Sequence, residues 1–155
     1  MKPADLIAHA ERLTSATQHR PRQVDLKRAV SAAYYAMFHA LAKECADTIV
    51  GAGAERNEQA WLQVYRALEH GMAKNACRQA KNRNLGAGIV KFATRFASMQ
   101  DERHTADYDP TSTYSRSDVL ALISEATVAI GDLAATPRPD RRAFVAVVLL
   151  RETRR

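Results

Sequence analysis

The chain has 155 residues, of which 46% are hydrophobic, with a formal net charge of +6 and a pI of about 9.6. This length predicts one domain whose core needs no metal or disulfide support. A secreted disulfide scaffold is disfavoured, because the only two cysteines, Cys45 and Cys77, lie on helical patterns without secretory context. We expect free thiols, a cytoplasmic location and no membrane segment, since the longest apolar run, 143–150, is too short to span a bilayer.

Residues 22–50 have the apolar spacing of one long helix, without an internal proline or glycine. The helix would be roughly 40 Å long at the usual helical rise, and Gly51 and Gly53 follow it as stop signals. Its broad apolar stripe must be covered by other helices, so the sequence predicts an all-α, up-and-down bundle of five to six helices. The stripe consists of Leu26, Val30, Ala33, Tyr34, Met37, Phe38 and Leu41.

Shorter patterns on both sides of this helix predict further elements. The first helix begins near Pro3, a favourable first helical position, and ends before Pro21. A third helix begins with Asn57 as its N-cap and carries a core-facing stripe as far as Met72. Residues 74–88 are rich in Asn and Gly, which predicts a loop or a broken helical turn.

Two long amphipathic patterns follow the loop. The fourth helix starts near Ala87. It should end near Asp107, because Pro110 disfavours helical geometry at the residue before it, Asp109. The fifth helix opens with Ser115 or Ser117 as its cap.

The segment 140–153 contains FVAVVLL, which is strand-like in composition, but flanking arginines and a possible cap at Asp140 favour a sixth helix. We expect residues 1–136 to form the bundle. Residues 137–155 would then be a basic helical segment that packs on the same domain or extends from it.

The basic residues cluster in the sequence, a pattern that suggests an anionic partner. Residues 71–100 contain no acidic side chain, and the tail is rich in arginine up to Arg154 and Arg155. Two interpretations stay open: a solvated face with a solubilising tail, or contact with nucleic acid, although few aromatic residues there offer base stacking. The candidate nucleic-acid-binding residues are Lys74, Arg78, Lys81, Arg83, Lys91 and Arg95.

The sharpest local feature is the sequence RHTADY at residues 103–108. Arg103 continues the apolar stripe of the fourth helix, and Asp107 stands four residues later, so the two side chains can pair. The positive charge of Arg103 would stabilise the Asp107 carboxylate, which is otherwise unfavourably placed at the negative end of the helix dipole. Tyr108 would approach Arg103 only if the last helical turn unwinds. The pair is either a structural ion pair or part of a site in which arginine binds phosphate.

The histidines and cysteines do not predict a metal site. His39 and Cys45, like His70 and Cys77, are too far apart in sequence for the paired ligands typical of helices. We therefore expect no metal and no cofactor. His104 points away from the face of Arg103, but it can act at a mobile helix end.

Two segments together resemble the HEPN proteins, the helical partners of minimal nucleotidyltransferases. They are SAAYYAMFHALAKE at residues 31–44 and RHTADYDP at residues 103–110. The resemblance implies a helical bundle that forms a homodimer, with the arginine motifs of the two subunits facing each other across a cleft. Many members are metal-independent ribonucleases marked by Arg-x(4–6)-His. Arg103 matches the arginine of that motif, whereas Tyr108 stands where a histidine is expected and no histidine follows His104.

Three functional hypotheses follow from the resemblance. In the favoured one, the chain is a homodimeric partner of a minimal nucleotidyltransferase in a toxin–antitoxin-like pair, and Tyr108 of the Arg-x4-Tyr motif accepts a nucleotidyl group. In the second, it is a ribonuclease toxin that uses Arg103 with Tyr108, Asp107 or His104. The third is a helical module that binds RNA or a nucleotide without chemistry. We further expect Tyr34 in the core and Tyr35 toward the dimer or the cleft, because adjacent helical residues cannot share a face.

Overall fold

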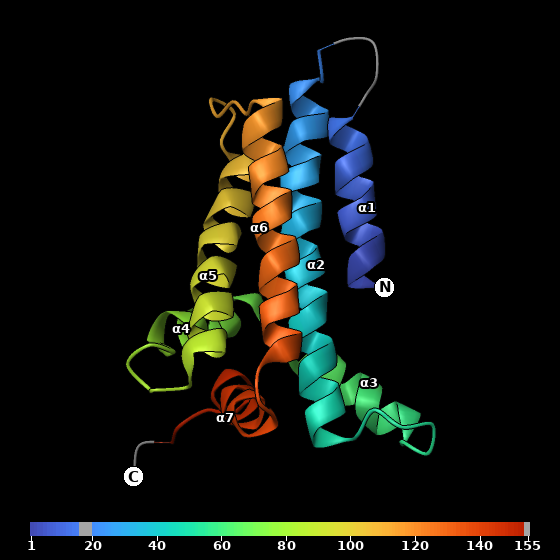
Figure 1. Cartoon of the computed structure of the whole chain (residues 1–155), viewed down its shortest axis with the longest axis vertical. Coiled ribbons are helices and arrows are strands. Elements are labelled where there is room, and N and C mark those ends of the chain that lie inside the picture. Colours follow the sequence, from blue (N-terminus) through green and yellow to red (C-terminus); the bar gives the residue numbers. More distant parts are fainter. Residues whose placement is uncertain (16–19, 154–155) are drawn as a thin grey trace.

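The computed structural model describes residues 1–15 and 20–153, and these contain seven α-helices and no β-strand (Figure 1). The all-α class predicted from the sequence is therefore confirmed. The helices are α1 (Pro3–Thr14), α2 (Gln23–Ile49), α3 (Glu58–Ala67), α4 (His70–Gln79), α5 (Ala87–Tyr108), α6 (Arg116–Ala135) and α7 (Arg138–Leu149).

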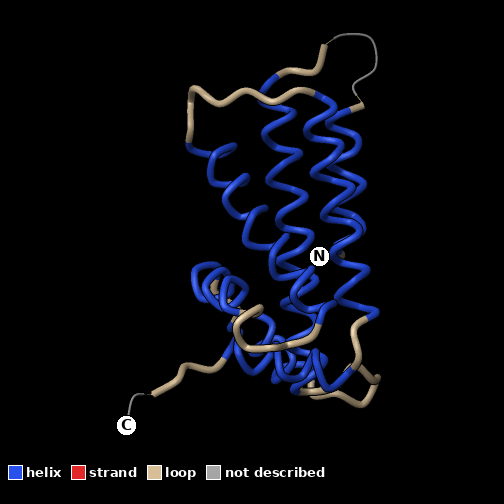
Figure 2. Tube along the Cα trace, turned by 60° about the vertical axis from the view of Figure 1, so that its left-hand side comes forward, coloured by secondary structure: helices blue, strands red, loops and turns tan. Residues whose placement is uncertain are grey.

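Four helices, α1, α2, α5 and α6, run alongside one another, and the other three, α3, α4 and α7, lie at the end of the bundle where α2 ends (Figures 1 and 2). The long helix α2 is central, because it packs against α1, α3, α5, α6 and α7. Its bounds match the predicted helix within one residue, and Gly51 follows its end as expected. The arrangement places the last turn of α5 beside the first half of α2.

Two of the three predicted N-caps are confirmed. The Asn57 side chain accepts a hydrogen bond from the Ala60 N–H at 2.9 Å and opens α3. Ser115, rather than Ser117, caps α6, and it forms a reciprocal capping box with Asp118. Such boxes satisfy two backbone donors that a helix start leaves free. The N-cap of α7 is Pro137, so the possible cap at Asp140 was wrong; that residue lies in the first turn of the helix.

The predicted third helix is two helices, which makes the count seven rather than five or six. Leu68 and Glu69 have extended backbone angles, so α3 ends at Ala67 and α4 starts at His70. The break buries Leu68 and redirects the chain behind α5. The loop predicted for residues 74–88 is also wrong in its first half, because α4 continues to Gln79. Its buried residues are small (Ala73, Ala76 and Cys77), and they give only a weak hydrophobic pattern.

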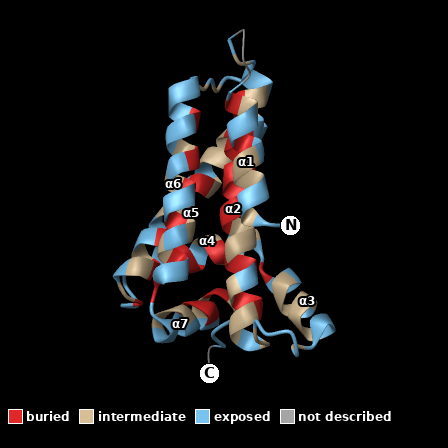
Figure 3. Cartoon of the chain, turned by 45° about the vertical axis from the view of Figure 1, so that its right-hand side comes forward, coloured by how far each residue is buried: buried red, intermediate tan, exposed pale blue. Residues whose placement is uncertain are grey.

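The core lies between α2, α5 and α6 and extends to α7, and buried residues line the inner faces of these helices (Figure 3). Tyr34, Phe92, Phe96 and Phe144 are its largest fully buried side chains, which confirms the core position predicted for Tyr34. The stripe of the third helix predicted to be core is so only in part: Leu68 is buried, whereas Val64 and Tyr65 are partly buried and pack against the core. No residue of α3 is fully buried, because the helix packs chiefly on α2 at the rim of the bundle.

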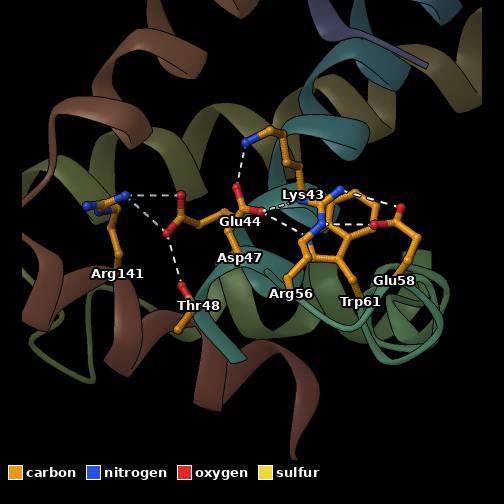
Figure 4. Close-up of polar contacts among 8 residues, drawn as sticks. All are labelled: Lys43, Glu44, Asp47, Thr48, Arg56, Glu58, Trp61 and Arg141. Atoms are coloured by element: carbon orange, nitrogen blue, oxygen red, sulfur yellow. Dashed lines mark hydrogen bonds and ion pairs between the residues drawn. The ribbon is translucent and has the colours of Figure 1, made fainter. Parts of the chain in front are cut away.

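The last turns of α2 carry two carboxylates at the negative end of the helix dipole, and both are neutralised by neighbouring segments (Figure 4). Glu44 accepts hydrogen bonds from Arg141 of α7 at 3.2 Å and from Thr48 at 3.1 Å. Asp47 accepts one from the Trp61 indole of α3 at 2.9 Å, and the Arg56 guanidinium lies 3.6 Å away. These contacts fasten α3 and α7 to the end of α2.

Helix α7 packs on α2, α4 and α5, and it buries Phe144, Val145 and Val148. The start of α7 lies close to the start of α5: a Cβ added to Gly86 would lie 2.6 Å from a carboxylate oxygen of Asp140. Gly86 also has a φ of +91°, which favours glycine at this position. No helix of the described residues has by itself the length and apolar composition to cross a membrane. Only α6 and α7 together meet these criteria, and they are bent by 113°.

Candidate functional site

Arg103 lies on the inner face of α5, where its side chain is only 15% exposed. Its guanidinium carbon lies 5.2 Å from the centre of the Tyr34 ring and 5.8 Å from that of Tyr35, both within cation–π range. The Nη1 atom donates to the Tyr35 hydroxyl at 3.4 Å and lies 3.5 Å from Asp107. The predicted pair of Arg103 and Asp107 is thus confirmed. The buried Nε of Arg103 has no hydrogen-bond partner within the described residues.

Asp107 joins this arginine to α2. One of its carboxylate oxygens pairs with Arg103, and the other accepts a hydrogen bond from the Ser31 hydroxyl at 2.5 Å. The carboxylate at the end of α5 is therefore stabilised by a cation on its own helix and by a hydroxyl on α2. Ser31 was not predicted. Its position in the tyrosine-rich segment, four residues before Tyr35, was the available signal.

The structure adds a histidine that spacing alone did not suggest. His70, at the start of α4, shares a hydrogen bond of 2.7 Å between its Nδ1 and the Tyr34 hydroxyl. Its ring stacks on Phe38 with the centres 4.0 Å apart, and it meets the Tyr35 ring edge-on. Burial lowers the pKa of His70, and the positive charge of Arg103 lowers it further. The cluster therefore favours a neutral imidazole beside a fixed cation.

We call this set the arginine cluster: Ser31, Tyr34, Tyr35, His70, Arg103 and Asp107. Its members come from α2, α4 and α5. Burial also raises the pKa of the Tyr34 hydroxyl, so that group stays protonated. A metal-free set of guanidinium, imidazole and phenol can bind an anion and transfer protons.

Tyr108 and His104 lie away from Arg103, as expected for an intact last turn, and in the described structure they contact each other. Helix α5 continues through Tyr108, so the last turn does not unwind and the tyrosine is 66% exposed. Its ring centre lies 4.9 Å from that of His104. Neither side chain has a hydrogen bond or ring contact with Arg103 among the described residues. The predicted site is thus divided into the half-buried arginine cluster and an exposed tyrosine.

A pocket of about 620 Å³ opens beside Tyr108, between the first turns of α2 and the end of α5. Lys27 from α2 donates a hydrogen bond to the Asp109 carbonyl at 3.1 Å and closes one side. Hydrogen bonds from the hydroxyl and the N–H of Thr111 lower the pKa of Asp109. The lining residues are Gln23, Val24, Lys27, Arg28, Ala106, Asp107, Tyr108, Asp109 and Pro110.

Most of the basic residues in the segment without acidic residues pair with acids from elsewhere in the fold. Asp101 pairs with both Lys74 and Arg78, and the other pairs are Arg83 with Glu152 at 2.9 Å and Arg95 with Glu125 at 2.6 Å. Lys81 and Lys91 are exposed. Four of the six candidate nucleic-acid-binding residues therefore carry a carboxylate partner, while Arg154 and Arg155 lie outside the described residues.

The two cysteines are buried free thiols. Burial raises the pKa of Cys45 to about 12 and also raises that of Cys77, so neither is poised as a thiolate nucleophile. Within residues 1–15 and 20–153, no group of three His, Cys, Asp or Glu side chains is placed to hold a metal ion.

The fold and the site define a class of protein: an all-helical bundle with a half-buried arginine cluster and an exposed tyrosine at the end of the same helix. No protein-family model, curated protein or solved structure matches the chain.

Proposed function

We propose that the chain is a HEPN-like, homodimeric partner of a minimal nucleotidyltransferase, and that the Tyr108 hydroxyl receives the nucleotidyl group. The observation that carries this proposal is the exposure of Tyr108, 66%, at the rim of a pocket where a second protein can reach it. Other tyrosines are less suitable acceptors. Tyr34 is fully buried, and the Tyr114 hydroxyl donates to Glu102 at 3.0 Å.

The proposed reaction is a phosphoryl-type transfer. The Tyr108 oxygen attacks the α-phosphorus of a nucleoside triphosphate, an oxygen–phosphorus bond forms, and the bond from that phosphorus to the departing pyrophosphate breaks. The phenolic proton passes to a base of the transferase. In this function Arg103 is a positioning residue, because its pair with Asp107 holds the last turns of α5 against α2.

The test is to incubate the chain with ATP, Mg²⁺ and the nucleotidyltransferase encoded beside it in the source genome. Intact-mass spectrometry should show the gain of one nucleotidyl group or more. Tyr108→Phe should remove that gain, whereas Tyr114→Phe should retain it. The proposal fails if no such gene lies beside this one and the purified chain binds no such enzyme, or if Tyr108→Phe is modified as fully as the wild type.

Metal-independent RNA cleavage is a second candidate, favoured by the position of His70. The hydrogen bond between His70 and Tyr34 sets a neutral imidazole in the same cluster as Arg103. With Nδ1–H donating to the Tyr34 hydroxyl, the imidazole Nε2 would take the proton of a ribose 2′-hydroxyl as that oxygen attacks the neighbouring phosphorus. The bond to the 5′-oxygen would break, and the 5′-oxygen would take a proton from water. Arg103 would stabilise the charge on the phosphate.

RNA incubated in EDTA with wild type, Arg103→Ala and His70→Ala separates the remaining functions. Cleavage that is lost in both variants supports the ribonuclease, and equal cleavage by all three proteins refutes it. Salt-sensitive binding of RNA without cleavage would instead support a non-catalytic binding module.

A further inference from the structure

Two cations and two carboxylates line the pocket at Tyr108, and they differ in how firmly the fold engages them. Both carboxylates in its lining are already engaged: Asp107 by Ser31 and Arg103, and Asp109 by Thr111. The cations have fewer fixed partners. Lys27 donates to the Asp109 carbonyl and, without a direct ion pair, its charge helps to lower the pKa of the Asp109 carboxyl. Arg28 is exposed and has no hydrogen bond or ion pair in the part of the chain that the structure describes.

The same pocket offers an apolar platform and a fixed wall. Val24 is 52% exposed, and it lines the pocket together with the exposed ring of Tyr108. Gln23 is held in place, because its side-chain amide both donates to the Tyr114 carbonyl and accepts from the Tyr114 N–H, each at 2.8 Å. The first turn of α2 is thereby tied to the loop after α5, and the lining is formed before any ligand binds.

This combination fits one ligand chemistry. Two cations that make no direct ion pair with a carboxylate of the described residues suit the oxygens of a phosphate, for which guanidinium and ammonium groups are common ligands. An exposed aromatic ring and an aliphatic side chain beside them suit a flat heterocycle. The volume of about 620 Å³ lies within the range of about 300–1,000 Å³ that is usual for small-molecule sites.

We propose that Lys27 and Arg28 form a phosphate subsite, and that the pocket at Tyr108 binds a nucleoside monophosphate moiety with its base against Val24 and the Tyr108 ring. The inference rests on the proposed function in one respect: the moiety is the nucleotidyl group delivered to Tyr108. After the transfer, the Tyr108 oxygen is bonded to the phosphorus of this group, and Lys27 and Arg28 offset the negative charge of its phosphate oxygens.

The first experiment needs no transferase. AMP, adenosine and inorganic phosphate are titrated into the unmodified chain, and binding is followed by shifts of backbone amide signals in NMR spectra. AMP should bind and shift signals of residues 23–28 and 106–110, and Lys27→Gln/Arg28→Gln should weaken it about tenfold or more. Adenosine should bind more weakly than AMP by a similar factor. Equal binding of adenosine and AMP, or equal affinity of the double variant, overturns the subsite.

The matched control is Lys2→Gln/Arg142→Gln, which removes the same two charge types from α7 and from the residue before α1, neither of which lines the pocket. It should bind AMP as the wild type does; an equal loss of affinity in both double variants shows a net-charge effect and overturns the subsite. Arg28→Gln alone guards against misfolding, because Arg28 makes no hydrogen bond or ion pair within the described residues that a glutamine would remove.

The second experiment uses the transferase. Under the proposal, Lys27→Gln/Arg28→Gln is modified about tenfold more slowly than the wild type or the control. Modification at the wild-type rate, with AMP bound equally well, overturns the subsite but leaves Tyr108 as the acceptor. Conversely, AMP binding that depends on Lys27 and Arg28 supports the subsite even if no transferase modifies the chain, in which case only the proposed function fails.

Discussion

Replacing Tyr34 with phenylalanine tests the arginine cluster most directly. Tyr34 is fully buried, and its hydroxyl shares a hydrogen bond of 2.7 Å with His70. Tyr34→Phe leaves the ring in place but removes this partner, so the half-buried His70 Nδ1 is left unpaired. Removing one partner of a buried hydrogen bond is expected to lower the free energy of unfolding by about 1–2 kcal/mol.

The adjacent tyrosine is the matched control. Its hydroxyl lies 3.4 Å from an Arg103 nitrogen and is only partly buried, so Tyr35→Phe should lower the free energy of unfolding by less than about 0.5 kcal/mol. For a domain of this size, 1 kcal/mol corresponds to about 2–4 °C, so Tm should fall by about 2–8 °C in Tyr34→Phe.

Urea unfolding followed by circular dichroism gives both free energies. If Tyr35→Phe destabilises the chain as much as Tyr34→Phe, the hydrogen bond to His70 does not stabilise the cluster as described.

Three further predictions concern other contacts. Glu44→Gln should lower the free energy of unfolding by about 1–2 kcal/mol, because it leaves Arg141 without its carboxylate; urea unfolding measures this. Gly88→Ala would place a Cβ 2.5 Å from the Thr136 hydroxyl and should lower the free energy of unfolding by about 1–3 kcal/mol, whereas Gly131→Ala, with open space around it, should raise it by about 0.5–1 kcal/mol, both measured by urea unfolding. The pKa of His70 is lower in the folded than in the unfolded chain, so its contribution to the free energy of unfolding is intact above about pH 6.5 and is lost as pH falls through the folded pKa. The free energy of unfolding, measured by urea unfolding from pH 7.5 to 5, should therefore decline less steeply in His70→Asn than in the wild type.

The sequence predicted what depends on near neighbours along the chain. The bounds of α2 and α5, the caps Asn57 and Ser115, and the pair of Arg103 with Asp107 all rest on spacings of four residues or fewer, or on an unbroken period. These signals are local, and the tertiary structure agrees with them.

The missed features depend on contacts between distant residues. The break at Leu68 keeps the apolar step of α3, so periodicity runs through it although the backbone does not. His70 joins Arg103 only because α4 turns behind α5, and no spacing in the sequence connects the two. Likewise, the segment without acids looked unpaired because Asp101, Glu125 and Glu152 all lie outside it.

The shallow attachment of α3 has a consequence for how the molecule opens. This helix has no fully buried residue, whereas α2 has thirteen, so its amide protons should exchange with solvent through local opening long before those of α2. Such an opening separates Tyr65 from His39 and Trp61 from Asp47. It leaves the arginine cluster intact, because that cluster is built from α2, α4 and α5. We therefore expect α3 to open locally at a lower free-energy cost than the helices that carry the arginine cluster.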